Sequence, residues 1–219
     1  MAFFVADKTG SKVIIEFLEG KTKVYSGSEA TYPVLCNSTY SNELNNISTF
    51  DGFGGTEKID LSSKEDKTRF VKAAYMLKKY DTSSSISPID YGFDILKTIS
   101  FEGNNKGDII TRWSIIYDIK NSRVLFRTAS AKEIKHLDLK DIDFSCQTTS
   151  KVYNLDNKKA TGDISTLLVD IKKGKSQKCL KKMWKGALLK ESFLNRVLVK
   201  SWATKGMINY SETVVCKNE

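Results

Sequence analysis

Histidine is almost absent from this chain, which has a single one, His136, in 219 residues. Ser-His-Asp catalysis, Cys-His pairs and histidine zinc sites would all depend on that one side chain. His136 lies in the strand-like stretch EIKHLDL, where we expect a structural rather than a catalytic role. The shortage of histidine therefore disfavours several common hydrolase and zinc-enzyme chemistries.

Proline and long apolar runs are also scarce. The chain has 2 prolines and no low-complexity tract, which argues against disorder. No apolar run approaches the roughly 18–20 residues of a membrane span, and residues 1–6 are too short, and lack the basic start, for a secretory signal. With 40% hydrophobic residues, the composition is that of a globular protein. We expect a cytoplasmic location.

The cysteines and glycines do not form a recognisable cofactor site. The 4 cysteines, Cys36, Cys146, Cys179 and Cys216, lack metal-ligand spacing, so we expect free thiols and no metal. The glycine-rich segment DGFGG at 51–55 lacks the strand-to-helix context of a phosphate loop and is interpreted as a flexible turn. No cofactor is therefore expected.

Positive charge is concentrated at the end of the chain. Residues 1–150 hold 20 basic and 20 acidic residues, whereas residues 151–219 hold 15 and 6 and so carry the whole net charge of +9. We divide the chain accordingly into a domain at 1–150 and a basic helical segment at 151–219, with helical patterns starting at Asp163. An apolar stripe in this segment lies opposite lysines: Leu180, Met183, Trp184 and Leu188 against Lys178, Lys181, Lys182 and Lys185. Two interpretations remain open. The apolar stripe packs on the domain at 1–150, or the segment binds an anionic partner or a membrane surface.

The pattern of apolar residues predicts an α+β fold. Strands are expected at 2–6, 12–18, 22–26, 32–37 and 133–139, a β-hairpin at 111–128, and helices at 66–80 and 89–99, with residues 37–46 and 51–55 as loop. Hairpin-linked strands with helices grouped between them indicate antiparallel sheets covered by helices.

Five segments in order carry a family resemblance. They are FFVADKTGSKVIIEFLEGKTKVY, VLCNSTY, TRFVKAA, FDIL, and TRWSIIYDIKNSRVLFRT ending in IKHLDLKDIDF. Over residues 1 to about 145 the chain resembles the later part of the linear amide C-N hydrolase family, which includes choloylglycine (bile salt) hydrolases and penicillin V acylases. The resemblance implies the αββα sandwich of an N-terminal nucleophile hydrolase, here a partial one.

The resemblance also implies a mechanism. In this family a cysteine at the mature N-terminus attacks an amide carbonyl, and its own α-amine serves as the base. An α-amine with a pKa near 8 can take a thiol proton without any imidazole, which suits a chain so poor in histidine.

Two residues match the family's functional positions. The family's asparagine after an apolar strand corresponds to Asn37, where it is expected to stabilise an oxyanion; taken alone it also fits a turn asparagine. The arginine of the family's S-R-F-V-R-A pattern corresponds to Arg69 of TRFVKAA, which either orients active-site groups or is a solvated helix charge. Cys36 and Thr39 replace the family's usual Thr and Pro beside Asn37.

The family's nucleophilic cysteine belongs to a segment that would precede the hairpin at 2–18. We therefore expect a C-terminal portion of such a hydrolase, inactive alone, whose partner is an N-terminal segment or chain supplying the nucleophile and whose substrate is then an N-acyl amide. An unpaired sheet edge predicts self-association. The alternative is a non-catalytic module whose basic tail binds an anionic partner or membrane. Nucleic acid is not expected as a partner, because the aromatics are not interleaved with the basic residues.

Overall fold

The computed structural model describes most of the chain before residue 171. The described residues are 1–63, 65–103, 110–145, 148–149 and 151–170. They fall into two compact units, the first formed by Met1–Leu139 and Leu155–Asp163 and the second by Lys140–Asn154 and the residues that follow Asp163. The basic stripe predicted at 178–188 and the other helices predicted after it lie outside the described residues, so the binding role of the tail stays a prediction.

Three antiparallel strands open the chain, in the order β1 (Ala2–Ala6), β2 (Lys12–Leu18) and β3 (Lys21–Ser26). The predicted hairpin and third strand are thus confirmed. Since side chains alternate between the two faces of a strand, Ile14 and its β3 partner Tyr25 are buried on one face. Phe3 and Phe17 lie on the other face, where both are exposed and their rings meet edge to face. Within the described residues β1 pairs with β2 alone, so self-association through its free side stays a prediction.

The stretch after this sheet differs from the sequence prediction. A short 3-10 helix (Gly27–Glu29) leads into residues 32–39, which are irregular rather than a strand, and residues predicted as loop form helix α1 (Tyr40–Ile47). The Thr39 hydroxyl caps this helix by accepting a hydrogen bond from the Asn42 N–H at 3.4 Å. The prediction of a strand at 32–37 is wrong because the backbone of this stretch is held by a side chain instead of a ladder.

That side chain is Tyr40, which is fully buried. Its hydroxyl accepts a hydrogen bond from the Tyr32 N–H at 2.9 Å and donates one to the Tyr32 carbonyl at 3.0 Å. Burial raises the pKa of the Tyr40 phenol above its ordinary value, so the phenol stays a donor at alkaline pH. A single phenol thereby closes the loop from 32 to 40.

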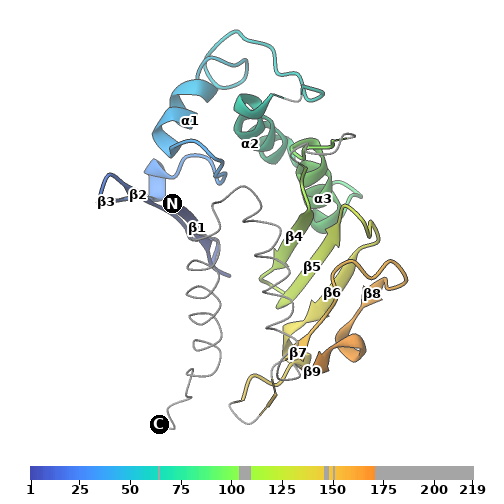
Figure 1. The fold of residues 1–219 in the computed structure, drawn as a ribbon. Coiled ribbons are helices and arrows are strands. Elements are labelled where there is room, and N and C mark those ends of the chain that lie inside the picture. Colours follow the sequence, from blue (N-terminus) through green and yellow to red (C-terminus); the bar gives the residue numbers. More distant parts are fainter. Residues whose placement is uncertain (64, 104–109, 146–147, 150, 171–219) are drawn as a thin grey trace, which may run out of the picture. The chain divides into compact units, whose positions relative to one another are not determined.

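Two further helices follow as predicted. A 3-10 turn (Asp66–Thr68) precedes α2 (Arg69–Lys79), and α3 (Pro88–Thr98) begins with a proline in its first turn and a Ser87 cap. Figure 1 shows α1, α2 and α3 following one another along the first unit. Their apolar faces and the first sheet share one core, which includes Ile14, Tyr25, Val34, Tyr40, Ile47, Phe50, Phe70, Val71, Ala74 and Ile95.

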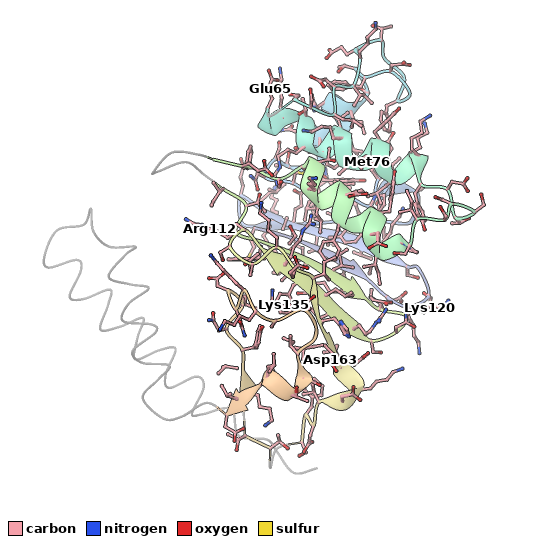
Figure 2. All side chains as sticks on the ribbon, turned by 90° about the vertical axis from the view of Figure 1, so that its right-hand side faces the viewer. Glu65, Met76, Arg112, Lys120, Lys135 and Asp163 are labelled. Atoms are coloured by element: carbon pink, nitrogen blue, oxygen red, sulfur yellow. The ribbon has the colours of Figure 1, made fainter. Side chains whose placement is uncertain are left out.

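The second sheet has the order β4 (Trp113–Asp118), β5 (Arg123–Thr128), β6 (Lys135–Asp138) and β8 (Gly162–Asp163), and its strands lie side by side in Figure 1. The first three are antiparallel, which confirms the predicted hairpin and the strand after it, and β8 pairs parallel with β6. Figure 2 labels Lys120 at the turn between β4 and β5 and Arg112 at the opposite end of β4.

Helix α3 approaches this second sheet closely at Gly92. A Cβ atom at position 92 would lie 2.9 Å from Cδ1 of Ile116 on β4. Arg127 of β5 adds a contact, since its guanidinium donates to the Phe93 carbonyl at 3.1 Å and lies 4.9 Å from the Phe93 ring centroid. A glycine and a stacked arginine therefore fix α3 against the sheet.

The second unit contains β7 (Lys151–Val152) paired with β9 (Val169–Asp170), and 3-10 helices at Leu139–Asp141, where it begins, and at Ser165–Leu167. Lys151 and Asp170 form an ion pair at 3.0 Å. The α-helix predicted to start at Asp163 is wrong for residues 163–170, because Asp163 pairs with β6, Val169–Asp170 pairs with β7, and the residues between them form only a 3-10 turn. Among the described residues, no helix is both long and apolar enough to cross a membrane.

The Tyr40 clamp gives a stability prediction. We expect Tyr40→Phe to lower the free energy of unfolding by about 1–3 kcal/mol, because it leaves the Tyr32 N–H and carbonyl without their partner. The matched control is Tyr117→Phe, since Tyr117 is 66% exposed, and it should change the free energy by less than about 0.5 kcal/mol. Urea denaturation of the three proteins measures this, and equal losses in both variants would contradict the clamp.

The turn between β4 and β5 gives a pH prediction. The Asn121 amide and the Arg123 guanidinium donate to the Asp118 carboxylate at 2.8 and 3.0 Å, and these bonds, Asn121 first, hold the pKa of Asp118 below its ordinary value. The stabilisation is present above the unfolded pKa and is lost as pH falls through the lowered pKa. We therefore expect Asp118→Asn to destabilise the protein near neutral pH, with the difference from wild type shrinking at strongly acidic pH. Thermal denaturation at a series of pH values measures it; a pH-independent difference would contradict it.

Candidate active site

A cavity of about 430 Å³ in the first unit brings the two predicted site residues together. Its lining comes from residues 1, 2, 16 and 18 of the opening hairpin, from residues 35–39, and from Arg69 and Ile99. Asn37 and Arg69 thus come from a loop and a helix and face one cavity.

Asn37 is placed by the loop that Tyr40 closes. It lies two residues before the Thr39 cap, and its side chain is exposed where it lines the cavity. Among the described residues its amide makes no hydrogen bond, so its N–H donors are available to a bound group. A side-chain amide on a backbone segment that is held in this way can donate to an oxyanion that develops on a carbonyl group.

Arg69 is held in place by contacts on two sides. It is the first residue of α2, its Nε donates to the Ile99 carbonyl at 2.8 Å, and its guanidinium lies 4.7 Å from the Phe101 ring centroid. A guanidinium that is hydrogen-bonded and stacked is preorganised, and lysine cannot reproduce both contacts. The structure therefore supports a fixed positive charge at the cavity wall.

Glu16 is a cavity residue that the sequence analysis missed. It lies on β2 with only 2% of its surface exposed, and its Oε1 accepts a hydrogen bond from the Tyr40 N–H at 3.0 Å. Its Oε2 is buried and has no hydrogen-bond partner in the described part of the chain. The sequence did contain one signal for Glu16. It is a charged residue two positions after Ile14 in the same predicted strand, so both side chains lie on one face.

Cys36 also lines the cavity, next to Asn37. Its side chain is half-buried. Because Cys36 is an internal residue, its nitrogen belongs to a peptide bond and cannot serve as an α-amine base. Cys36 therefore does not fit the N-terminal nucleophile that the family mechanism uses.

Other candidate sites carry less chemistry. A larger cavity, of about 470 Å³, lies between the end of α3 and the second sheet and includes neither Asn37 nor Arg69. His136 is on β6 opposite Leu125 and lines neither of these cavities. In the described ranges, no group of three or more His, Cys, Asp or Glu side chains is placed to bind a metal ion. The cavity at Asn37 and Arg69 is the candidate active site.

The chain is similar to known acylases and hydrolases. A penicillin V acylase from Pectobacterium atrosepticum is 25% identical over 160 residues, a match that covers 64% of this chain and 42% of that protein. The structure of penicillin V acylase from Agrobacterium tumefaciens superposes with a TM-score of 0.64 at 23% identity, over 77% of this chain and 56% of that one. A conjugated bile acid hydrolase variant from Clostridium perfringens gives a TM-score of 0.51 at 19% identity, over 65% and 51% of the two chains.

The chain therefore spans about half the length of the relatives that it matches. The structural similarities confirm the predicted α+β fold of the N-terminal nucleophile hydrolases for the described residues. Residues 1–153 match the family of linear amide C-N hydrolases described as the choloylglycine hydrolase family. Since this match covers well over half of its residues, the chain belongs to the linear amide C-N hydrolases of the choloylglycine hydrolase family.

Proposed function

We propose that this chain forms part of a linear amide hydrolase, to which it supplies Asn37 and Arg69, and that the cysteine nucleophile comes from a segment outside these 219 residues. The proposal is carried by one observation, the single cavity that both side chains line. The 219 residues alone do not cleave amides, because the thiol at this cavity, Cys36, has no α-amine of its own.

The proposed reaction is acyl transfer. The incoming cysteine passes its thiol proton to its α-amine and attacks the amide carbon, so that a C–S bond forms and the carbonyl electrons move to oxygen. Asn37 donates an N–H to this oxyanion. When the C–N bond breaks, the electron pair leaves with nitrogen, which takes the proton from the α-ammonium. Water then hydrolyses the thioester.

Arg69 supports this reaction as a positioning residue. Its bonded and stacked guanidinium keeps the Ile99 backbone and the start of α2 at the cavity wall. A fixed positive charge there favours the negative charge that develops during the reaction.

The substrate class is the linear N-acyl amide, as the names of the matched relatives suggest. Penicillin V and a glycine-conjugated bile acid are the first two assay substrates, and an N-acyl amino acid is the third. They share an open-chain amide and differ in the acyl group, so their relative rates identify the acyl preference.

A reconstitution experiment tests the proposal. The chain alone should show no turnover of the three substrates, whereas a fusion in which a cysteine-led N-terminal segment of a penicillin V acylase precedes Ala2 should hydrolyse at least one. Product release measured by chromatography reports the activity, and the control fusion has serine in place of the leading cysteine. Activity of the chain alone, or an inactive but folded fusion, would overturn the proposal.

Variants of the fusion test the two residues. Asn37→Ala should lower kcat by about 10²- to 10³-fold, the loss typical of an oxyanion donor, and Arg69→Ala should lower kcat/KM by at least about tenfold. Asn45→Ala and Arg112→Ala are matched controls, since both residues are exposed and lie outside the cavity. If the cavity variants keep the activity of these controls, Asn37 and Arg69 have no role in the reaction.

A further inference from the structure

Glu16 lines the candidate active site, and one oxygen of its carboxyl group has no hydrogen-bond partner among the described residues. Glu16 is 2% exposed, and its buried Oε2 has no hydrogen-bond partner among the described residues. Buried polar atoms in folded proteins are almost always paired, and leaving one unpaired costs about 1–3 kcal/mol. Because Glu16 is also a lining residue of the cavity, a bound group can supply the missing partner.

The neighbouring residues do not supply that partner themselves. The Tyr40 N–H is already donated to Oε1 at 3.0 Å. Lys23 lies opposite Glu16 on β3, but its ammonium is directed at the Tyr25 ring, 4.8 Å from the ring centroid. On the other side, the β1 residue opposite Glu16 is Ala2, whose side chain has no donor. Within the described part of the chain, Oε2 is therefore a buried acceptor without a partner, on a residue that lines the cavity.

A hydrogen-bond donor on the ligand is what this oxygen requires. We propose that Glu16 Oε2 accepts the N–H of the scissile amide while Asn37 donates to its carbonyl oxygen, so that the site selects secondary amides over esters and N-alkylated amides. This inference rests on the proposed hydrolase function and adds a residue that determines its substrate class.

The two contacts match the two ends of one amide group. A secondary amide presents an acceptor oxygen and a donor N–H, and the cavity presents an amide donor at Asn37 and a carboxyl acceptor at Glu16. An ester places an oxygen lone pair against Glu16 Oε2, and an N-methyl amide places a methyl group there. A site that hydrogen-bonds a substrate N–H rejects analogues without it, because its own buried polar group is then left unpaired. Glu16 exchanges no proton and keeps this hydrogen bond as the C–N bond breaks.

Glu16→Gln separates this role from a structural one. Glutamine has the same shape, and its carbonyl oxygen can still accept the Tyr40 N–H, but its NH₂ then replaces the acceptor at the cavity with a donor. The experiment uses the reconstituted fusion, with the p-nitroanilide and the p-nitrophenyl ester of phenoxyacetic acid as probes. Both release a coloured product, and they differ in carrying N–H or oxygen at the scissile bond.

We expect Glu16→Gln to lower kcat/KM for the anilide by about 10- to 100-fold and to leave kcat/KM for the ester unchanged or raised. The matched control is Glu29→Gln, because Glu29 is exposed and does not line the cavity; it should change neither value. An equal loss for both probes would assign Glu16 a structural role, and an unchanged anilide rate would exclude its contact with the amide. Either result overturns the inference.

A second measurement uses the unmutated fusion, so that it holds even where Glu16→Gln lowers the melting temperature too far to assay. Phenoxyacetyl butylamide should inhibit ester turnover at least about tenfold more strongly than its N-methyl derivative, and equal inhibition overturns the inference. If the folded fusion turns over neither probe, the proposed function fails and the inference fails with it. If both probes are turned over and Glu16→Gln leaves their ratio unchanged, only the inference fails.

Discussion

One hydrogen bond, from the Tyr40 N–H to the Glu16 carboxyl group, joins the first sheet to the start of α1. The Tyr40 side chain adds two more bonds, both to the Tyr32 backbone, so one residue ties the loop to the sheet and closes it upon itself. Asn37 lies within this loop. An irregular segment samples many conformations unless its ends are fixed, and the backbone position of Asn37 therefore depends on this one buried residue.

The cavity combines groups of opposite hydrogen-bonding character that come from separate elements. Strand β2 contributes a carboxyl group, the loop contributes an amide, and α2 contributes a guanidinium fixed by the Ile99 carbonyl. A carboxyl acceptor beside an amide donor matches the polarity of a peptide-like bond. In the proposed amide hydrolysis none of these three groups has to act as a base near neutral pH. A chain with a single histidine can therefore take part in that reaction.

Much of the fold could be predicted because its main strands and two of its helices have clear sequence patterns. The apolar and β-branched runs in 2–26 and 111–128, separated by turn residues, and the helical spacing in 69–79 specify those elements. Helix α1 was missed because polar residues dominate it, and its only strong signal was the Thr39 cap ahead of Asn42. Residues 163–170 were misread as helix because a short apolar run fits either structure. Asn37 and Arg69 were found through the family resemblance, whereas Glu16 was not, since a charged residue within a strand does not reveal that it is buried.

The position of Met1 has a practical consequence. Met1 lines the same cavity as Asn37 and Glu16, and its carbonyl accepts the Phe17 N–H at 2.9 Å, which fixes the direction in which any preceding residue would leave the sheet. A purification tag placed before Met1 would therefore begin at the cavity, where its own peptide N–H groups could bind the free oxygen of Glu16. Such a tag would compete with small ligands in a binding assay and would imitate a bound amide in a crystal. Material intended for ligand studies should carry its tag at the other end of the chain.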